Sequence, residues 1–468
     1  MLEKSLLKKI KYAESQFQKG EREKAIKEII LLLKDFPRNK NLLNTLGIFY
    51  AKTEHFAEAG GIFKKLLKLY PDNNSYANNL VNLFVLQNNF IDAQDIVKSL
   101  ADKCPDIYKY QRDCGIIFHK TGNTNLSKKY LLRALNLNSK NYDLMLTLST
   151  VLIKKGEYSE GWRLYESRFN HSTISEKIKI IPKQILNGDI PRYNGEDLTN
   201  KKILIHAEQG YGDFIMSMRY FKNLRDKYRG LKIYVICNEP LKKILEVNSE
   251  ISNVVSYAET EKINFITADF WEFIMSIPRY FEKEDHKLEL FSPYINHEIQ
   301  ISNFNQWVID HKKINIGISY HGNSDFVNDV HRSMSSLIWF REIIELEKFN
   351  FIYLNVDDIE KQIKEFNLNI RRPKLNSFQD TYSILKKLDL VISTDTSIVH
   401  LAGASGVECW TLLGYISSSW IWGEKETTTE RYSSIKLYRQ KKPGDWACLM
   451  SKVKQDLLIR FANHQIPN

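Results

Sequence analysis

The chain has 468 residues, of which 43% are hydrophobic and 26% charged, and this composition excludes an intrinsically disordered protein. Lysine and arginine number 67 against 56 aspartate and glutamate residues, and the net charge of +11 favours anionic partners such as nucleotides, phosphorylated sugars or acidic surfaces. The basic residues are spread along the chain and form no recognisable nucleic-acid-binding module, so we expect no nucleic-acid partner, whereas peripheral contact with a membrane surface stays open.

Two absences in the sequence bear on location and on metal binding. The chain begins MLEKSLLKKIKYAESQF, an amphipathic, lysine-rich pattern without the apolar segment of a signal peptide. No run of apolar residues reaches the ~18 needed to span a bilayer, so we expect a cytoplasmic protein. The five cysteines form no C-x-x-C pair and there is no H-E-x-x-H motif, so we expect neither a metal site nor a bound cofactor.

The first 170 residues repeat with a period of 34. Two residue series carry this period, Ala25, Ala59 and Ala93, and Pro37, Pro71 and Pro105. Tetratricopeptide helix pairs have the same period, with small residues where two helices approach and a proline after the second helix. We therefore predict a tetratricopeptide α-solenoid of four to five repeats over residues 1–170, with helical hairpins of another solenoid as the alternative. Such an array is expected to bind a protein or peptide partner.

Helical periodicity stops near residue 170. Residues 171–200 contain prolines, glycines and turn-forming Asn and Asp, which is typical of a linker. After it, short β-type runs alternate with helical patterns in two series, over residues 201–305 and 306–468. The alternation predicts parallel sheets covered by helices. The expected fold class is therefore α + α/β, an α-solenoid followed by two Rossmann-like domains.

The individual elements can be assigned from the apolar runs and their periodicity. The expected strands are residues 202–207, 231–237, 254–259, 265–270, 314–320, 350–356, 388–394 and 408–414. The expected helices of the same part of the chain are residues 215–228, 240–247, 335–347, 357–366, 381–388 and 445–464. Ligands of parallel α/β sheets bind at the carboxyl ends of the strands, and three polar clusters follow expected strand ends.

The first polar cluster, HAEQGYGDF, follows the expected strand 202–207. Gly210 and Gly212 permit a tight turn after Gln209, and Asp213 then lies at the start of a helix. Asp213 is either a cap for the orphan N–H groups of that helix or a general base that faces the cleft. The glycines do not form G-x-G-x-x-G, so a dinucleotide-binding fingerprint is not supported.

The second polar cluster, GISYHGNSDFVNDVHRS, follows the expected strand 314–320. Its candidate binding residues are Tyr320, His321, Asn323, Asn328, Asp329 and Arg332. So many donors and acceptors on one loop suit sugar hydroxyls or phosphate oxygens, and the planar guanidinium of Arg332 can bind two phosphate oxygens. The alternative is an ordinary solvated loop.

The third polar cluster is STDTSIVHLAGASG, after the expected strand 388–394. Asp395, Thr396 and Ser397 form a turn before a helix whose N-terminal N–H groups attract phosphate, and the two hydroxyls can donate to phosphate oxygens. His400 lies on the first turn of this helix. The alternative is that the turn only caps the helix and that His400 is a core residue; the periodicity does not decide between them.

Residues 190–468 resemble family 9 glycosyltransferases, the heptosyltransferase-like group, in the subset that carries N-terminal tetratricopeptide repeats. The matching segments are PRYNGEDL, ILIHAEQGYGD, IGISYHGN, the ND and RS pairs that follow it, LDLVISTDTSIVHLAGASG, and LYRQ with GDW near the end. The resemblance implies a GT-B fold, in which two Rossmann-like domains form the site. It also implies a donor whose phosphates lie at residues 395–400, and Asp213 as the base. The family generally works without a metal.

The resemblance implies a hexosyl- or heptosyltransferase. It would move sugar from a nucleotide-diphosphate sugar to a glycan, glycolipid or protein acceptor. Arg332, with Ser397 and His400, would stabilise the departing phosphate. Two alternatives remain, a protein-glycosylating enzyme whose peptide is held by the repeats and a catalytically lost scaffold that binds a sugar nucleotide.

Overall fold

The computed structural model describes residues 2–170, 187–208, 210–259, 267–283, 293–298, 303–323, 329–416 and 419–463. The chain divides into two compact units, Met1–Leu144 and Met145–Asn468, which we call the repeat unit and the sheet unit. Within the described ranges, no helix is both long enough and apolar enough to cross a membrane.

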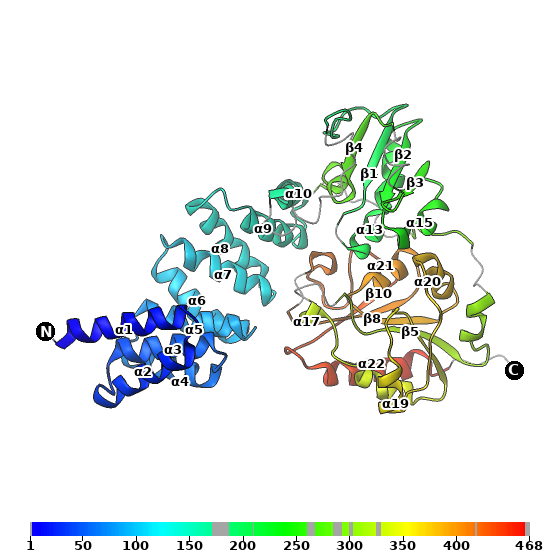
Figure 1. Cartoon of the computed structure of the whole chain (residues 1–468). Helices are drawn as coiled ribbons and strands as arrows, with labels where there is room; N and C mark the ends of the chain where they lie inside the picture. The colour runs from blue at the N-terminus through cyan, green and yellow to red at the C-terminus, as the bar shows by residue number, and fades with distance from the viewer. Residues whose placement is uncertain are drawn as a thin grey trace. The chain divides into compact units, whose positions relative to one another are not determined.

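The repeat unit consists of consecutive antiparallel helical hairpins, drawn from blue to cyan in Figure 1. Its helices are α1 (Leu2–Gln18), α2 (Arg22–Asp35), α3 (Lys40–Lys52), α4 (Phe56–Leu69), α5 (Asn74–Leu86), α6 (Phe90–Lys103), α7 (Tyr108–Lys120) and α8 (Thr124–Leu137). The repeated alanines Ala25, Ala59 and Ala93 are fully buried. The repeated prolines follow the ends of α2, α4 and α6, which confirms the predicted helical repeat array.

Small residues set how closely the helices of one hairpin approach. A Cβ at Gly115 of α7 would lie 2.8 Å from Cγ of Leu131 and 3.0 Å from its backbone N on α8. Leu131 is fully buried, so it has no room to move away. Glycine at position 115 therefore lowers the helix propensity of α7 but permits the close approach of α7 and α8.

Replacement of Gly115 by Ala should lower the free energy of unfolding of the repeat unit by about 1–3 kcal/mol, since the added methyl overpacks the hairpin. Gly61→Ala is the matched control, because a Cβ at Gly61 of α4 meets no atom within 4 Å and alanine favours a helix by up to about 1 kcal/mol. Urea unfolding followed by far-ultraviolet circular dichroism measures both changes. Equal stabilisation of the two variants would contradict the close approach of α7 and α8.

The sheet unit begins with helical segments that the sequence assigns to the array. These are α9 (Tyr142–Lys154), in which the boundary between the units falls, α10 (Tyr158–Tyr165) and the 3₁₀ helix η1 (Glu166–Asn170). The described part of the expected linker, residues 187–200, packs on the first sheet. Tyr193 and Leu198 are buried there, and Arg192 pairs with Trp271 of that sheet.

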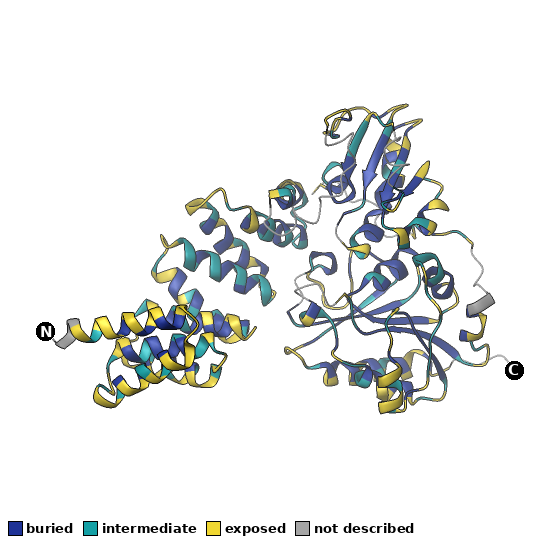
Figure 2. Cartoon of the chain, in the orientation of Figure 1, coloured by how far each residue is buried: buried dark blue, intermediate teal, exposed yellow. Residues whose placement is uncertain are grey.

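The first sheet is four-stranded and parallel, with the order β3-β2-β1-β4. Its strands are β1 (Lys202–His206), β2 (Lys232–Cys237), β3 (Asn253–Ser256) and β4 (Phe270–Phe273), and its helices are α13 (Tyr211–Ser217), α14 (Arg219–Lys227), α15 (Glu239–Glu246) and η2 (Ile274–Tyr280). The apolar runs of β1 and β2 are buried, as strands covered by helices require (Figure 2).

The second sheet is six-stranded and parallel, with the order β10-β9-β8-β5-β6-β7. Its strands are β5 (Ile314–Ser319), β6 (Phe349–Tyr353), β7 (Ile370–Arg371), β8 (Leu390–Thr394), β9 (Cys409–Leu413) and β10 (Ile435–Arg439). The accompanying helices are η3 (Asn303–Val308), α17 (Asp329–Arg332), η4 (Leu337–Phe340), α18 (Arg341–Ile344), α19 (Glu360–Phe366), α20 (Phe378–Leu385), α21 (Ser397–Ala404), η5 (Trp420–Trp422) and α22 (Trp446–Arg460). The two sheets confirm the predicted α/β class for this half of the chain.

Several expected elements differ from the observed ones. The expected helix 215–228 is divided at Met218 into α13 and α14, and the expected helix 335–347 is a 3₁₀ helix followed by a short α-helix. The expected strand 265–270 lies partly outside the described residues, and the strand found there is β4. Strand β10 was not predicted, because it is a short edge strand in which Lys436 and Arg439 interrupt the apolar run.

One hydrophobic core runs through both sheets of the sheet unit, and it contains Ile203 and Ile205 of β1 as well as Val391 of β8 and Val399 of α21. A buried carboxylate, Glu282, adds polar contacts between segments that meet at this core. It accepts hydrogen bonds from Trp162 Nε1 of α10 at 2.8 Å, from the hydroxyl of Tyr220 and from the guanidinium of Arg431. Burial alone would raise the pKa of Glu282, but the charge of Arg431 and the donated hydrogen bonds lower it.

Candidate functional site

Asp213 lies on the first turn of α13, which follows the carboxyl end of β1. Its Oδ2 accepts a hydrogen bond from the backbone N–H of Gly210, the N-cap residue, at 3.1 Å. The carboxylate therefore does serve the helix start, through the third helical position and not as the N-cap itself. This local role and a role as a base are compatible, since the side chain is only partly buried.

The surroundings of Asp213 raise its pKa toward neutral pH. Burial raises the pKa of Asp213 to about 6, and the negative charges of Asp395 and Glu208 raise it as well. The N–H of Gly210 and the positive charge of Arg332 act in the opposite direction. A carboxylate with a pKa near the working pH is suited to general base catalysis.

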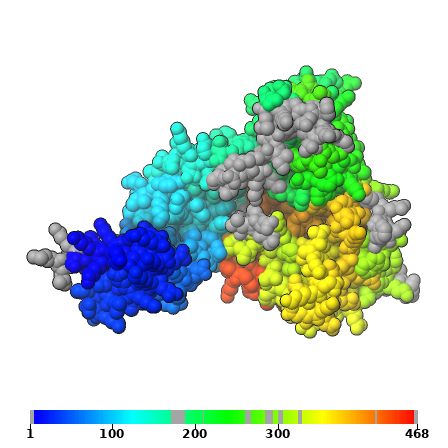
Figure 3. All heavy atoms as spheres, viewed as in Figure 1, coloured from blue at the N-terminus to red at the C-terminus, as the bar shows by residue number. Residues whose placement is uncertain are grey.

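Gly212 brings the turn of Asp213 against the first turn of α21. A Cβ at Gly212 would lie 2.6 Å from Cδ2 of His400 and 3.4 Å from Cα of Ser397, so a larger side chain would force the two helices apart. Helices α13 and α21 pack directly on each other, and Figure 3 shows the two sheet regions, green and orange, in contact. Two of the three polar clusters predicted from the sequence are therefore adjacent.

The start of α21 is an internally bonded cap. Thr396 is the N-cap residue, and its Oγ1 accepts a hydrogen bond from the N–H of Ile398 at 3.3 Å and lies 3.1 Å from Oγ of Ser393. Thr396 is buried and Ser397 is partly buried. Burial raises the pKa of the neighbouring Asp395, whereas Trp422 and Arg332 lower it and Asp329 raises it. Thr396 therefore caps α21, and Ser397 is the more accessible of the two hydroxyls.

His400 is a buried, neutral histidine. Its Nδ1 lies 2.9 Å from the hydroxyl of Tyr432, and its ring stacks on Trp422 with centroids 5.3 Å apart and an interplanar angle of 17°. Burial lowers its pKa to about 3, and the charges of Arg219 and Arg332 also lower it. A neutral imidazole can donate one hydrogen bond to a phosphate oxygen, but it adds no positive charge.

The second polar cluster joins the site through Arg332 and Asp329. Arg332 Nε donates to Asp329 Oδ1 at 2.9 Å, and Asp329 is buried. Gly322 permits this arrangement, because a Cβ there would lie 2.6 Å from Nη2 of Arg332. Since the charge of Arg332 acts on the pKa of Asp213, Asp395 and His400, it lies near all three.

Other residues of this cluster are bonded to a different part of the second sheet. The hydroxyl of Tyr320 accepts from Nε2 of Gln362 at 2.9 Å, and Nε2 of His321 lies 3.1 Å from Asp357. The hydrogen bond with Asp357 raises the pKa of His321. Asn323 is exposed.

Two of the predicted site residues, Gln209 and Asn328, lie outside the described residues. The structure therefore brings together Gly210, Gly212, Asp213, Asp329, Arg332, Asp395, Ser397 and His400, with Thr396 beneath them as the cap.

The carboxyl edge of the second sheet carries buried polar atoms that have no hydrogen-bond partner among the described residues. They are Oδ1 of Asn355 after β6, Oγ1 of Thr394 at the end of β8 and Nε2 of Gln440 after β10. Buried polar groups are usually bonded, so this edge has unused capacity for a polar ligand. The sequence did not mark Asn355 as a site residue, because it falls inside the expected strand 350–356, whereas β6 ends at Tyr353.

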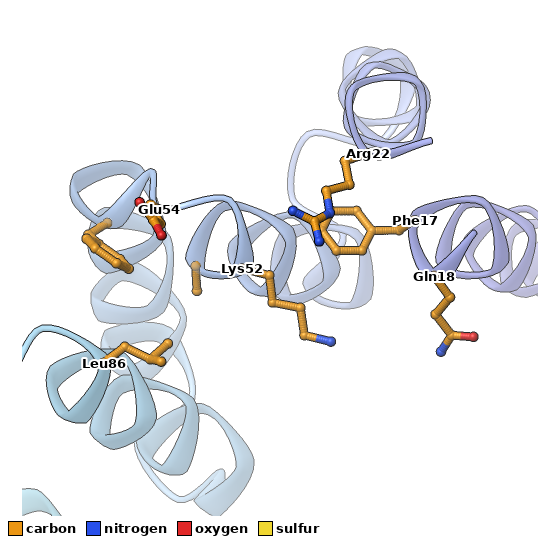
Figure 4. Close-up of a pocket in the computed structure, with 8 residues that line it drawn as sticks. Phe17, Gln18, Arg22, Lys52, Glu54 and Leu86 are labelled. Carbon is orange, nitrogen blue, oxygen red and sulfur yellow. The ribbon is translucent and has the colours of Figure 1, made fainter. Parts of the chain in front are cut away.

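The repeat unit has a hollow of its own, of about 490 Å³, between α1 and α5 (Figure 4). Phe17 and the exposed Leu86 give it apolar walls, and its charged lining residues are Arg22, Lys52 and Glu54. The guanidinium of Arg22 lies 6.0 Å from the ring centroid of Phe17. Such a lining suits a peptide with both apolar and acidic side chains.

Comparisons with known proteins found a curated relative and solved structures, all at low sequence identity. No family model matches the chain. Protein FlbA of Caulobacter vibrioides is 23% identical over 65% of this chain, which spans 53%, about half, of the length of that relative. MamA from Desulfovibrio magneticus RS-1 matches 35% of this chain and 94% of its own, at 13% identity and a TM-score of 0.32. YrrB, a TPR protein with an unusual peptide-binding site, matches 35% and 84%, at 14% identity and a TM-score of 0.32.

Replacement of Asp213 by Asn should stabilise the sheet unit at alkaline pH. Because the pKa of Asp213 is raised in the folded protein, the wild type loses stability as the pH rises from about 4 through 6, whereas the variant does not. At pH ~8 the variant should be more stable by about 2–3 kcal/mol, and near pH ~4 the difference should vanish. All eight tryptophans lie in residues 145–468, so tryptophan fluorescence during urea unfolding reports this unit alone.

The control for this measurement is Asp226→Asn, which removes a carboxylate paired with Lys222 on the exposed face of α14. It should show no such pH dependence. If the free energy of unfolding of both variants depends on pH in the same way, the raised pKa of Asp213 is contradicted.

Proposed function

We propose that the sheet unit is a glycosyltransferase that moves sugar from a nucleotide-diphosphate sugar to a glycan, glycolipid or protein acceptor. The observation that carries the proposal is the contact of Gly212 with Ser397 and His400. This contact sets Asp213, whose pKa is about 6, beside the N-terminus of α21 and the guanidinium of Arg332. A base and an anion-binding terminus are thereby adjacent, as sugar transfer from a nucleotide donor requires.

The proposed reaction assigns one role to each group. Asp213 takes the proton of the acceptor hydroxyl while the hydroxyl oxygen attacks the anomeric carbon of the donor sugar. The bond from that carbon to the diphosphate oxygen breaks at the same time. The nucleotide diphosphate leaves with the additional negative charge. The N–H groups at the start of α21, the hydroxyl of Ser397 and the guanidinium of Arg332 stabilise that charge without a metal. His400, being neutral, contributes at most a hydrogen bond.

The rest of the donor has a place along the second sheet. The unpartnered atoms of Asn355, Thr394 and Gln440 lie at the carboxyl ends of β6, β8 and β10, where nucleotides bind in parallel α/β sheets. Two parallel sheets with facing site residues support the GT-B interpretation and the resemblance to family 9.

The hollow of the repeat unit supports a second candidate, in which the acceptor is a protein that the repeats hold. Arg22 and Lys52 would contact acidic side chains of that protein, and Phe17 and Leu86 its apolar ones. Mass spectrometry of proteins that co-purify with the chain tests this candidate. A sugar added to a bound protein supports it, and a sugar found only in the lipid fraction contradicts it.

The Asp213→Asn variant should bind the donor as the wild type does but transfer sugar at least about 100-fold more slowly, because it lacks the base. A thermal-shift screen against UDP-, GDP-, ADP-, CMP- and dTDP-sugars identifies the donor, since a bound ligand raises the stability of the folded state. Release of the free nucleotide then measures turnover. Asp226→Asn should keep full activity, and an Asp213→Asn variant as fast as the wild type would contradict the assignment of the base.

A further inference from the structure

A fully buried arginine of η1 holds the residues that precede the turn of Asp213. Arg168 Nε and Nη2 donate to the two carboxylate oxygens of Glu208 at 2.9 and 2.7 Å, and both side chains are almost completely buried. Glu208 lies two residues before Gly210, whose N–H is bonded to Asp213. The Arg168–Glu208 pair and the Gly210–Asp213 hydrogen bond, linked along the chain, therefore connect η1 with the candidate base.

The remaining donors of Arg168 are also used. Nη1 donates to Glu166 Oε1 at 2.8 Å and Nη2 to Ser276 Oγ at 2.6 Å, and the guanidinium lies 4.1 Å from the ring centroid of Phe169. Glu208 Oε1 in turn accepts from the N–H of Met275 at 3.2 Å. Because these hydrogen bonds hold the guanidinium of Arg168 in one place, it fixes the position and orientation of the Glu208 carboxylate.

The buried Arg168–Glu208 pair is expected to add little net stability, which indicates a role other than stability alone. Burial of two charges costs free energy that their attraction only about offsets, and an apolar pair of similar volume is often as stable. The pair also joins η1, the residues that follow β1, and η2, three segments whose relative position determines where the turn of Asp213 lies. Such pairs are well suited to fixing one arrangement among several.

We infer that Arg168 is a positioning residue for Asp213, and that η1 is therefore part of the candidate site. The bidentate pair with Glu208 sets residues 207–208 and, through them, the turn of residues 210–213. The catalytic part of this inference rests on the proposed function, whereas the positioning of the turn does not.

Hydrogen exchange tests the positioning without any need for activity. In Arg168→Met, the amides of residues 210–217 should exchange about tenfold faster or more, while those of β2 and α15 keep their wild-type rates. Arg168→Lys should restore only part of the protection, because an ammonium cannot make the planar bidentate contact. Arg163→Met is the matched control, since Arg163 makes an equivalent bidentate pair with Glu160 on the exposed face of α10.

Two results of this experiment would overturn the inference. Unchanged exchange in residues 210–217 would show that the pair does not hold the turn. Faster exchange throughout the sheet unit would show that Arg168 only stabilises the fold. If Arg168→Met does not fold, Arg168→Lys and Glu208→Gln allow the same comparison, because both keep hydrogen-bonding groups in place.

The pH profile of donor turnover tests the link to the base. The charged groups that act on Asp213 are Asp395, Arg332 and Glu208, together with the N–H of Gly210. Glu208→Gln removes a negative charge that raises the pKa of Asp213, so the acid limb of the profile should move to lower pH. An acid limb that stays in place would contradict the link between Glu208 and the base. If the wild type turns over no nucleotide sugar, the proposed function fails, and hydrogen exchange still decides the role of Arg168.

Discussion

The site of the sheet unit depends on the close approach of α13 and α21 at Gly212. A single Cβ at this position would lie 2.6 Å from the ring of His400, so the distance between the two helices is set by the absence of a side chain. This approach makes the core continuous from β1 to β8 and turns two strand ends toward each other. Because the contact lies one residue before Asp213, it also determines what the carboxylate of Asp213 faces.

The electrostatics of the site follow from that contact. Asp213 and Asp395 follow strands of different sheets, and the negative charge of Asp395 raises the pKa of Asp213, whereas the positive charge of Arg332 lowers it. Buried beside them, His400 stays neutral and serves as packing between Gly212, Trp422 and Tyr432. The site thus combines one carboxylate ready to accept a proton with one guanidinium and a helix N-terminus.

Much of the fold was predictable because it depends on local patterns. The 34-residue period identified the helical array, and the apolar runs identified β1, β2, β5, β6, β8 and β9. Edge strand β10 and the divided helices were missed, since their sequences lack the continuous pattern of buried elements. Within the candidate site, strand ends and glycines pointed to Gly212, Asp213 and Asp395.

The parts of the site that depend on distant partners could not be predicted. The stacking of His400 on Trp422, the pairing of Arg168 with Glu208 and the bonding of His321 to Asp357 join residues 22 or more positions apart. No local pattern in the sequence marks these pairs. The hydrogen bonds by which Thr396 caps α21 are likewise visible only in the structure.

Nucleotide footprinting by hydrogen exchange tests the central claim most directly. When a nucleoside diphosphate that stabilises the protein is added, residues 210–217, 329–332 and 397–404 should be protected together, because one ligand would lie against all three segments. Protection confined to the repeat unit, or to only one of these segments, would contradict a shared site between the two strand ends.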